Sequence, residues 1–192
     1  MLFRSLLTDS LPAISIGMEK SNRDLLKDKP RGKNESILNK DFLLGIGFEG
    51  LLIAIFTMVA FYIGNPKETP LTASTMAFAT LCLARLFHGF NCRGKGSIFK
   101  LGVFSNKYVW YAFGVGLVLL NAVLFVPFLQ NLFEVENLAF NQYVSIYVLA
   151  FIPTLIIQLK KVIFEFIENK KSKNNANINR SGDRKSTRLN SS

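Results

Sequence analysis

Residues 42–63 read FLLGIGFEGLLIAIFTMVAFYI, a run of 22 residues in which Glu49 alone is charged. Three further apolar stretches of similar length follow, at 71–91, 108–129 and 143–163. A helix rises about 1.5 Å per residue, so a run of this length extends over roughly 33 Å and can cross about 30 Å of hydrocarbon. The sequence therefore predicts an all-α membrane protein with a bundle of four transmembrane helices.

The composition of the 192-residue chain supports this prediction. The chain is 49% hydrophobic and contains 18 Phe, whereas charged residues make up 19% and lie mainly between the apolar stretches. This chain is too apolar for a disordered protein, and the blocks of apolar residues are unlike those of a soluble domain. The two cysteines, Cys82 and Cys92, are too few for a disulfide framework.

Basic residues are concentrated in alternate connections. Three connecting segments hold 17 Lys and Arg residues, and the other two hold one. The basic segments are 20–41, 93–107 and 160–180, and the others are 64–70 and 130–142. Because basic connections stay in the cytoplasm, we expect the three basic segments on that side of the membrane. A nucleic-acid-binding protein would instead gather them on one folded surface, so we expect the lipid bilayer as a partner and no nucleic acid.

Both ends of the chain look foreign to the protein. Residues 183–192 read DRKSTRLNSS, which is the translation of a common sequencing-adapter oligonucleotide. Residues 1–5 read MLFRS, which matches the opposite adapter end read from a GTG start codon. We therefore expect both segments to be assembly artefacts and the rest to be a fragment of a longer protein. The alternative is that both are genuine polar termini.

Residues 6–18 read LLTDSLPAISIGM and place a carboxylate in an apolar segment. Pro12 cannot donate a backbone hydrogen bond and clashes with the preceding turn, which would free carbonyl oxygens there. With the Asp9 carboxylate and the Thr8 hydroxyl beside them, these oxygens would form a cage suited to a hard cation. The alternative is that Thr8 or Asp9 caps the start of a soluble helix.

The same segment resembles the sixth transmembrane helix of bacterial P-type calcium-transporting ATPases, in TDSLPA and the following IGME. The resemblance continues along the chain in KDKPR, FHGFNCR, SIF, FSNKY and VPFL, which begin at Lys27, Phe87, Ser97, Phe104 and Val126. It implies that 6–18 is the cytoplasmic half of helix six and that 19–41 is a cytoplasmic loop. Residues 42–171 would then hold helices seven to ten, and 172–182 would be a polar tail, which we expect to be disordered.

The resemblance also implies a site. Asp9 aligns with the cation-ligating Asp of helix six, and Thr8 with the Thr beside it. The ligating Asn that the family carries three residues before that Thr falls at Ser5, inside the suspected adapter. Arg85 stands where members with two calcium sites have a ligating Glu, and a guanidinium offers no oxygen. The resemblance therefore implies one cation per cycle, with calcium as the transported ion. Magnesium and ATP would act only in the parent pump, whose missing N-terminal part would be the partner of this chain.

Arg85 needs a partner at membrane depth, because an isolated charge in hydrocarbon is costly. Glu49 lies seven residues from Phe42, and Arg85 lies six residues from Asn91. At about 1.5 Å per residue, both would sit roughly 10 Å from the cytoplasmic ends of their spans. We therefore predict a structural ion pair between Glu49 and Arg85. The alternative is that Arg85 points at the cation site as a built-in positive charge.

Other chemistry has little support. Cys82, His88 and Cys92 are three candidate ligands, whereas a structural zinc site needs four, so we interpret His88 as a helix-packing residue. The sequence has neither the Asp-Lys-Thr-Gly-Thr phosphorylation motif nor a Gly-rich phosphate loop, so this chain is not expected to hydrolyse ATP alone. We predict a fragment of a cation pump, with calcium as its cargo, in a bacterial cell membrane. The alternative is a free-standing four-span scaffold or binding protein.

A first prediction concerns the two ends. Resequencing the locus from clean genomic DNA should give other codons before Leu6 and after Gly182, with Asn in place of Ser5 as the resemblance implies. Recovering both Met1–Ser5 and Asp183–Ser192 unchanged would show that these segments are genuine.

Overall fold

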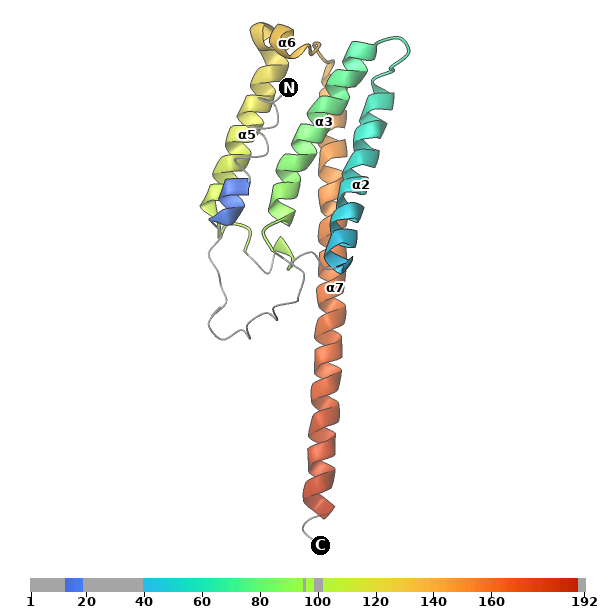
Figure 1. The fold of residues 1–192 in the computed structure, drawn as a ribbon, viewed down its shortest axis with the longest axis vertical. Coiled ribbons are helices and arrows are strands. Elements are labelled where there is room, and N and C mark those ends of the chain that lie inside the picture. The colour runs from blue at the N-terminus through green and yellow to red at the C-terminus, as the bar shows by residue number, and fades with distance from the viewer. Residues whose placement is uncertain (1–12, 19–39, 95, 99–101, 190–192) are drawn as a thin grey trace.

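The structure is a computed structural model that describes residues 13–18, 40–94, 96–98 and 102–189 (Figure 1). The named helices are α2 (Lys40–Ile63), α3 (Pro70–Asn91), α5 (Lys107–Phe125), α6 (Pro127–Phe133) and α7 (Phe140–Leu189). A turn of helix at 13–17 precedes them. Four helices, α2, α3, α5 and α7, are long and apolar enough to cross a membrane. The predicted all-α membrane fold with four spans is therefore confirmed.

Helix α3 is the centre of the bundle and packs against α2, α5 and α7 (Figure 1). More than half of its span is buried, whereas very little of the α2 span is buried. Side chains from all four spans meet in one apolar core. Its members include Ile53, Met76, Leu83, Leu124 and Ile146. The small residues of α3, such as Ala73 and Ala79, are fully buried and let its neighbours approach closely.

The connections lie at the two ends of the bundle in the order that the charges predict. The α2–α3 turn and the segment 126–139 lie at one end, and the segment between α3 and α5 lies at the other, beside the start of α2 (Figure 1). At the first end, the Thr72 hydroxyl donates to the Glu136 carboxylate at 2.6 Å, and the Thr75 hydroxyl accepts from the Glu136 backbone N–H at 3.0 Å. These bonds tie the first turns of α3 to the segment 126–139.

The third span ends earlier than its apolar sequence. Helix α5 stops at Phe125, and Val126 is extended, with φ −86° and ψ 117°. The reason is Pro127, which disfavours helical backbone at the residue before it and has no N–H to donate. The short helix α6 then begins at Pro127 and ends at Phe133, and the next residue, Glu134, is left-handed with φ 52°. Pro153, in contrast, lies inside α7 without ending it.

Helix α7 continues well past its transmembrane part. Its apolar span covers Phe140–Ile167, and the helix then runs on to Leu189, away from the bundle (Figure 1). The sequence predicts a disordered polar tail here, and the structure gives helix instead. Adding one residue to an existing helix forms one hydrogen bond for each residue that is fixed, so extension is far less costly than starting a new helix.

The turn between α2 and α3 depends on Gly64. A Cβ atom built on this buried residue would lie 2.4 Å from Cα and 2.9 Å from N of Ala73, both in the backbone of α3. The Thr69 hydroxyl donates to the Gly64 carbonyl at 2.8 Å and closes the turn. The first two spans can therefore meet this closely only with glycine at position 64.

We predict that Gly64→Ala destabilises the protein by about 1–3 kcal/mol, because the clash is with backbone that cannot move aside. Thermal unfolding of the detergent-solubilised protein measures the effect. Gly47→Ala is the matched control on α2, since a Cβ atom there meets nothing within 4 Å. It should be neutral or slightly stabilising, because alanine favours helix. Equal melting temperatures for the two variants would contradict the prediction.

Candidate functional site

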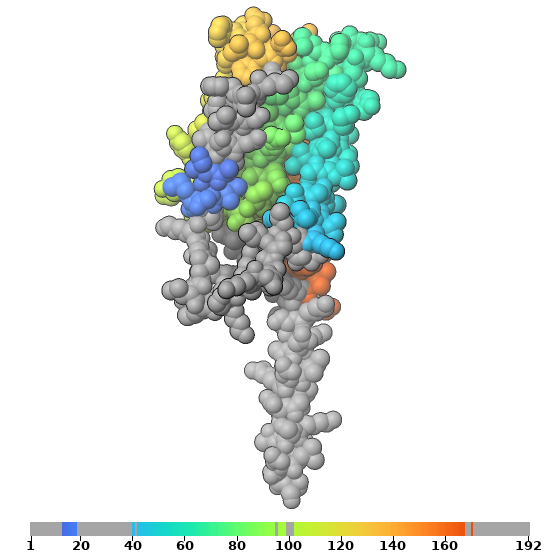
Figure 2. Space-filling view, in the orientation of Figure 1, coloured from blue at the N-terminus to red at the C-terminus, as the bar shows by residue number. Residues whose placement is uncertain are grey.

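The predicted cation-site residues, Thr8 and Asp9, lie outside the residues that the structure describes, so their role stays a prediction. The first described residues of the same segment form the helical turn 13–17, directly after Pro12. Figure 2 shows this turn seated on the bundle beside α3 and α5. The way in which the turn is held is therefore the nearest structural information on the predicted site.

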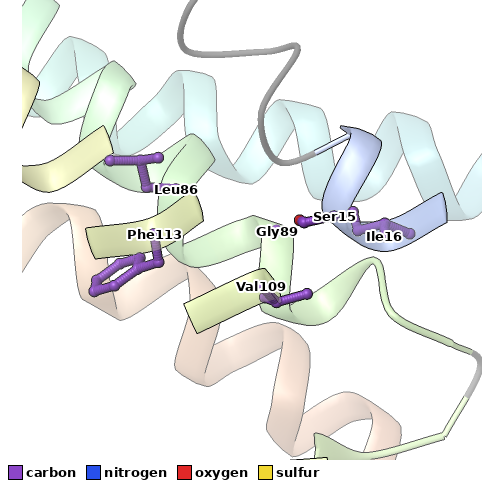
Figure 3. Close-up of a pocket in the computed structure, with 6 residues that line it drawn as sticks. All are labelled: Ser15, Ile16, Leu86, Gly89, Val109 and Phe113. Atoms are coloured by element: carbon purple, nitrogen blue, oxygen red, sulfur yellow. The ribbon is translucent and has the colours of Figure 1, made fainter. Parts of the chain in front are cut away.

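The turn lies in a socket formed by α3 and α5. Ser15 is 4% exposed. Around Ser15 and Ile16, the lining side chains come from both helices: Leu86 and Gly89 from α3, and Val109 and Phe113 from α5 (Figure 3). The two helices approach closely at Gly116, where a Cβ atom would lie 2.5 Å from Cδ2 of Leu86.

A buried asparagine connects this turn to α5. Asn106 is the N-cap of α5, and its Oδ1 accepts from the backbone N–H groups of Tyr108 at 3.0 Å and Val109 at 3.4 Å. Its Nδ2 donates to the carbonyl of Ser15 at 3.1 Å. One side chain therefore satisfies two otherwise unpaired donors at the start of α5 and a carbonyl of the turn.

A groove of about 770 Å³ runs between α2, α3 and α7. Its wall on α2 consists of residues at helical spacing, among them Gly45, Glu49 and Ile53. Arg85, His88, Asn91, Cys92 and Lys161 line the polar part of the groove. Both members of the predicted ion pair thus face the same groove, from adjacent helices.

In this groove Glu49 contacts His88, which we interpreted from the sequence as a helix-packing residue. The Glu49 Oε2 lies 3.4 Å from Nε2 of His88, and this contact is a salt bridge when the imidazole is protonated. The other imidazole nitrogen, Nδ1, is buried and has no hydrogen-bond partner among the described residues. His88 is one helical turn from Arg85, so both cationic candidates lie on one face of α3. The pair between Glu49 and Arg85 stays a prediction.

Three polar side chains of α7, at helical spacing, form hydrogen bonds with the end of α3 and the segment after it. Gln158 contacts the Asn91 side chain and accepts from the Ile98 N–H at 3.2 Å. The Lys161 ammonium donates to the Asn91 carbonyl and, at 2.9 Å, to the Gly94 carbonyl. The Glu165 carboxylate accepts from Ser97 N at 2.7 Å and from its hydroxyl at 3.0 Å. These bonds fix the C-terminal end of α3.

The sequence analysis did not identify the roles of Gln158, Lys161 and Glu165 on α7, or the role of Asn106. The spacing of 158, 161 and 165 by three and four residues was the available signal, because it places the three on one helix face. Within the described part of the chain, no group of three or more His, Cys, Asp and Glu side chains could hold a metal ion. Cys82 is buried and Cys92 is exposed, and both are free thiols.

Comparison with known proteins places these features in a family. The model of the family described as cation transporting ATPase, C-terminus, matches residues 1–163. The chain is similar to a calcium-transporting ATPase of Bacillus cereus, with 32% identity over 182 residues, which cover 84% of this chain and 20% of the relative. It is also similar to a calcium-transporting ATPase of Listeria monocytogenes, with 42% identity over 126 residues, 65% of this chain and 14% of the relative.

A mammalian protein matches over a similar range. Calcium-transporting ATPase type 2C member 2 of Rattus norvegicus is 31% identical over 176 residues, 90% of this chain and 18% of the relative. The chain thus spans a fifth or less of the length of these three relatives.

We predict that Glu49 is energetically coupled to Arg85 and to His88. Removing one partner of an ion pair strands the other charge, which costs on the order of 3–5 kcal/mol for a fully buried pair and less for a partly exposed one, whereas removing both costs less than removing one. Double-mutant cycles with Glu49→Gln, Arg85→Gln and His88→Gln, read as melting in detergent, should give a coupling above roughly 1 kcal/mol for the arginine. The coupling to His88 should be about 0.5–1.5 kcal/mol, as for a single hydrogen bond. Additive effects in the Glu49 and Arg85 cycle would reject that pair.

Proposed function

The chain belongs to the C-terminal family of cation-transporting ATPases, and we propose that it supplies the last four membrane spans and part of the cation site of an ATP-driven calcium pump. One observation carries the proposal: the family match covers the Thr8–Pro12 motif, the first three spans and the fourth span as far as residue 163. Several similar proteins are calcium-transporting ATPases, which supports calcium as the transported ion. The multi-pass fold and the bacterial relatives support a place in a bacterial cell membrane.

The proposed chemistry of the site follows from its oxygen atoms. The Asp9 carboxylate, the Thr8 hydroxyl and the carbonyls freed before Pro12 would bind the cation, because a hard ion prefers charged and neutral oxygen ligands. Phosphorylation of an aspartate elsewhere in the parent, with ATP and magnesium, would switch access to this site between the membrane faces. The segment 19–41 would lie on the cytoplasmic side and help couple that event to the site.

One cation per cycle is the proposed stoichiometry. Arg85 has only donor groups, so it cannot replace a carboxylate as a ligand of a second calcium ion. In the full-length pump we expect one calcium bound per phosphorylatable site. A free-standing four-span scaffold is not favoured, because the family match covers most of the chain.

The proposal is tested with Asp9→Asn in the full-length pump. This change removes a ligand charge, so phosphorylation from ATP should lose its calcium dependence and fall to background. Phosphorylation from inorganic phosphate, which proceeds without calcium, should survive and show that the protein is folded.

The matched control is Glu68→Gln, which removes a carboxylate at the opposite end of the bundle, where Glu68 accepts from the Asn65 amide at 2.7 Å. It should leave calcium dependence unchanged. Calcium-dependent phosphorylation that persists in the Asp9→Asn variant would remove Asp9 from the site, and two calcium ions bound per wild-type pump would reject the single site.

A further inference from the structure

Asn106 joins two segments that lie 91 residues apart in the chain. Its side chain is 5% exposed, so water does not compete for its hydrogen bonds. The oxygen is used by the first turn of α5, and the nitrogen is used by the carbonyl of Ser15. The residue is therefore more than a cap, because a cap needs only the oxygen.

The carbonyl that accepts from Asn106 belongs to the segment that carries the proposed cation ligands. Ser15 lies in the helical turn 13–17, in which the Met18 N–H donates to the Ile14 carbonyl at 3.2 Å. Carbonyls near the end of a helix often accept from donors outside the helix, and the Asn106 amide is such a donor for the Ser15 carbonyl. Ser15 is six residues after Asp9 and three after Pro12.

The socket around the turn cannot by itself fix its orientation. Leu86, Gly89, Val109 and Phe113 line the side facing the bundle, and three of these four offer apolar side chains (Figure 3). Apolar contacts tolerate sliding and rotation of a short helix, whereas a hydrogen bond to a carbonyl is directional and short. The bond from Asn106 to Ser15 therefore sets the rotation and the depth of the turn.

We propose that Asn106 is a positioning residue for cation binding, which holds the Ser15 carbonyl and thereby fixes the segment that carries Thr8 and Asp9. The inference rests on the proposed function, since it takes Asp9 as a cation ligand. Partners behind the ligands of a metal site contribute to affinity by orienting them, and their loss typically costs 10–100-fold in affinity. Asn106 acts through several residues of chain, so its effect should be smaller.

Two variants separate the two roles of Asn106. Asn106→Ser keeps an oxygen that can cap α5 and removes the amide donor, without adding charge. Asn106→Asp also keeps the cap and turns an acceptor toward the Ser15 carbonyl. In the full-length pump, both should raise the calcium concentration for half-maximal phosphorylation from ATP by roughly three- to tenfold, the loss of about one hydrogen bond. The maximal phosphorylation level and calcium-free phosphorylation from inorganic phosphate should not change.

The matched control is Trp110→Phe at the same end of α5. It deletes the bond from the indole N–H to the Val103 carbonyl at 2.9 Å and keeps an aromatic ring beside Phe90 and Phe104. Because Trp110 does not contact the turn through that bond, its calcium dependence should equal that of the unchanged pump. An equal shift in this variant would overturn the inference, since the effect would then come from general disturbance of α5.

The remaining outcomes also decide between the two proposals. If Asp9→Asn abolishes calcium dependence but neither Asn106 variant shifts it, the proposed function stands and the positioning role fails. A loss of maximal phosphorylation and of protein stability without a calcium shift would likewise reduce Asn106 to a helix cap. If Asp9→Asn leaves calcium dependence intact, Asp9 is not part of the site, and the inference fails with that part of the proposed function.

Discussion

Hydrocarbon offers no hydrogen-bond partners, so every backbone N–H and C=O group at membrane depth has to find one within the protein. Within a long helix these groups pair with one another. At a helix end they need partners from elsewhere in the protein. At the end of α5, Pro127 cannot continue the ladder, and the Leu124 carbonyl accepts instead from the Gln130 amide at 2.6 Å and from the Tyr143 hydroxyl at 3.3 Å. In the site proposed before Pro12, a bound cation would satisfy the freed carbonyl oxygens, as the Gln130 and Tyr143 side chains satisfy the Leu124 carbonyl here.

The same constraint organises the end of the bundle at which α3 stops. Gln158, Lys161 and Glu165 on α7 hold the segment that follows α3, and the guanidinium of Arg93 donates to the carbonyl of residue 102 at 3.1 Å farther along that segment. The segment then reaches Asn106, which caps α5 and holds the turn 13–17. A continuous series of polar contacts thus connects the last helix to the segment of the proposed site. The apolar core alone would not define this end, because apolar contacts between helices in lipid gain little over contacts with the lipid itself.

Much of the fold could be predicted from hydropathy, because four long apolar runs leave few alternatives, and the charge asymmetry predicts the orientation. Rotation about each helix could not be predicted in the same way. Counting residues places Glu49 level with Arg85, and only the packing of α2 against α3 shows that the imidazole of His88 lies 3.4 Å from the Glu49 carboxylate. Lys161 lies near the end of a span, where a lysine ordinarily reaches for water, so its spacing from Gln158 and Glu165 does not by itself predict bonds to two carbonyls. Asn106 appears in the sequence analysis only as a residue of the FSNKY motif, which assigns it no role. Thr8 and Asp9 were identified from the motif, and their geometry lies outside the described residues.

The rotation of α3 also bears on how Arg85 is used. Its neighbours Ala84 and Leu86 are 1% and 3% exposed, whereas Arg85 is exposed toward the groove that Glu49 lines. Leu86 faces the turn 13–17 instead, and successive residues of a helix are about 100° apart, so these are two different faces of α3. A guanidinium at membrane depth is least costly where an acid already lies, which favours the Glu49 side. To reach the turn 13–17, Arg85 would have to extend around its own helix, away from that carboxylate.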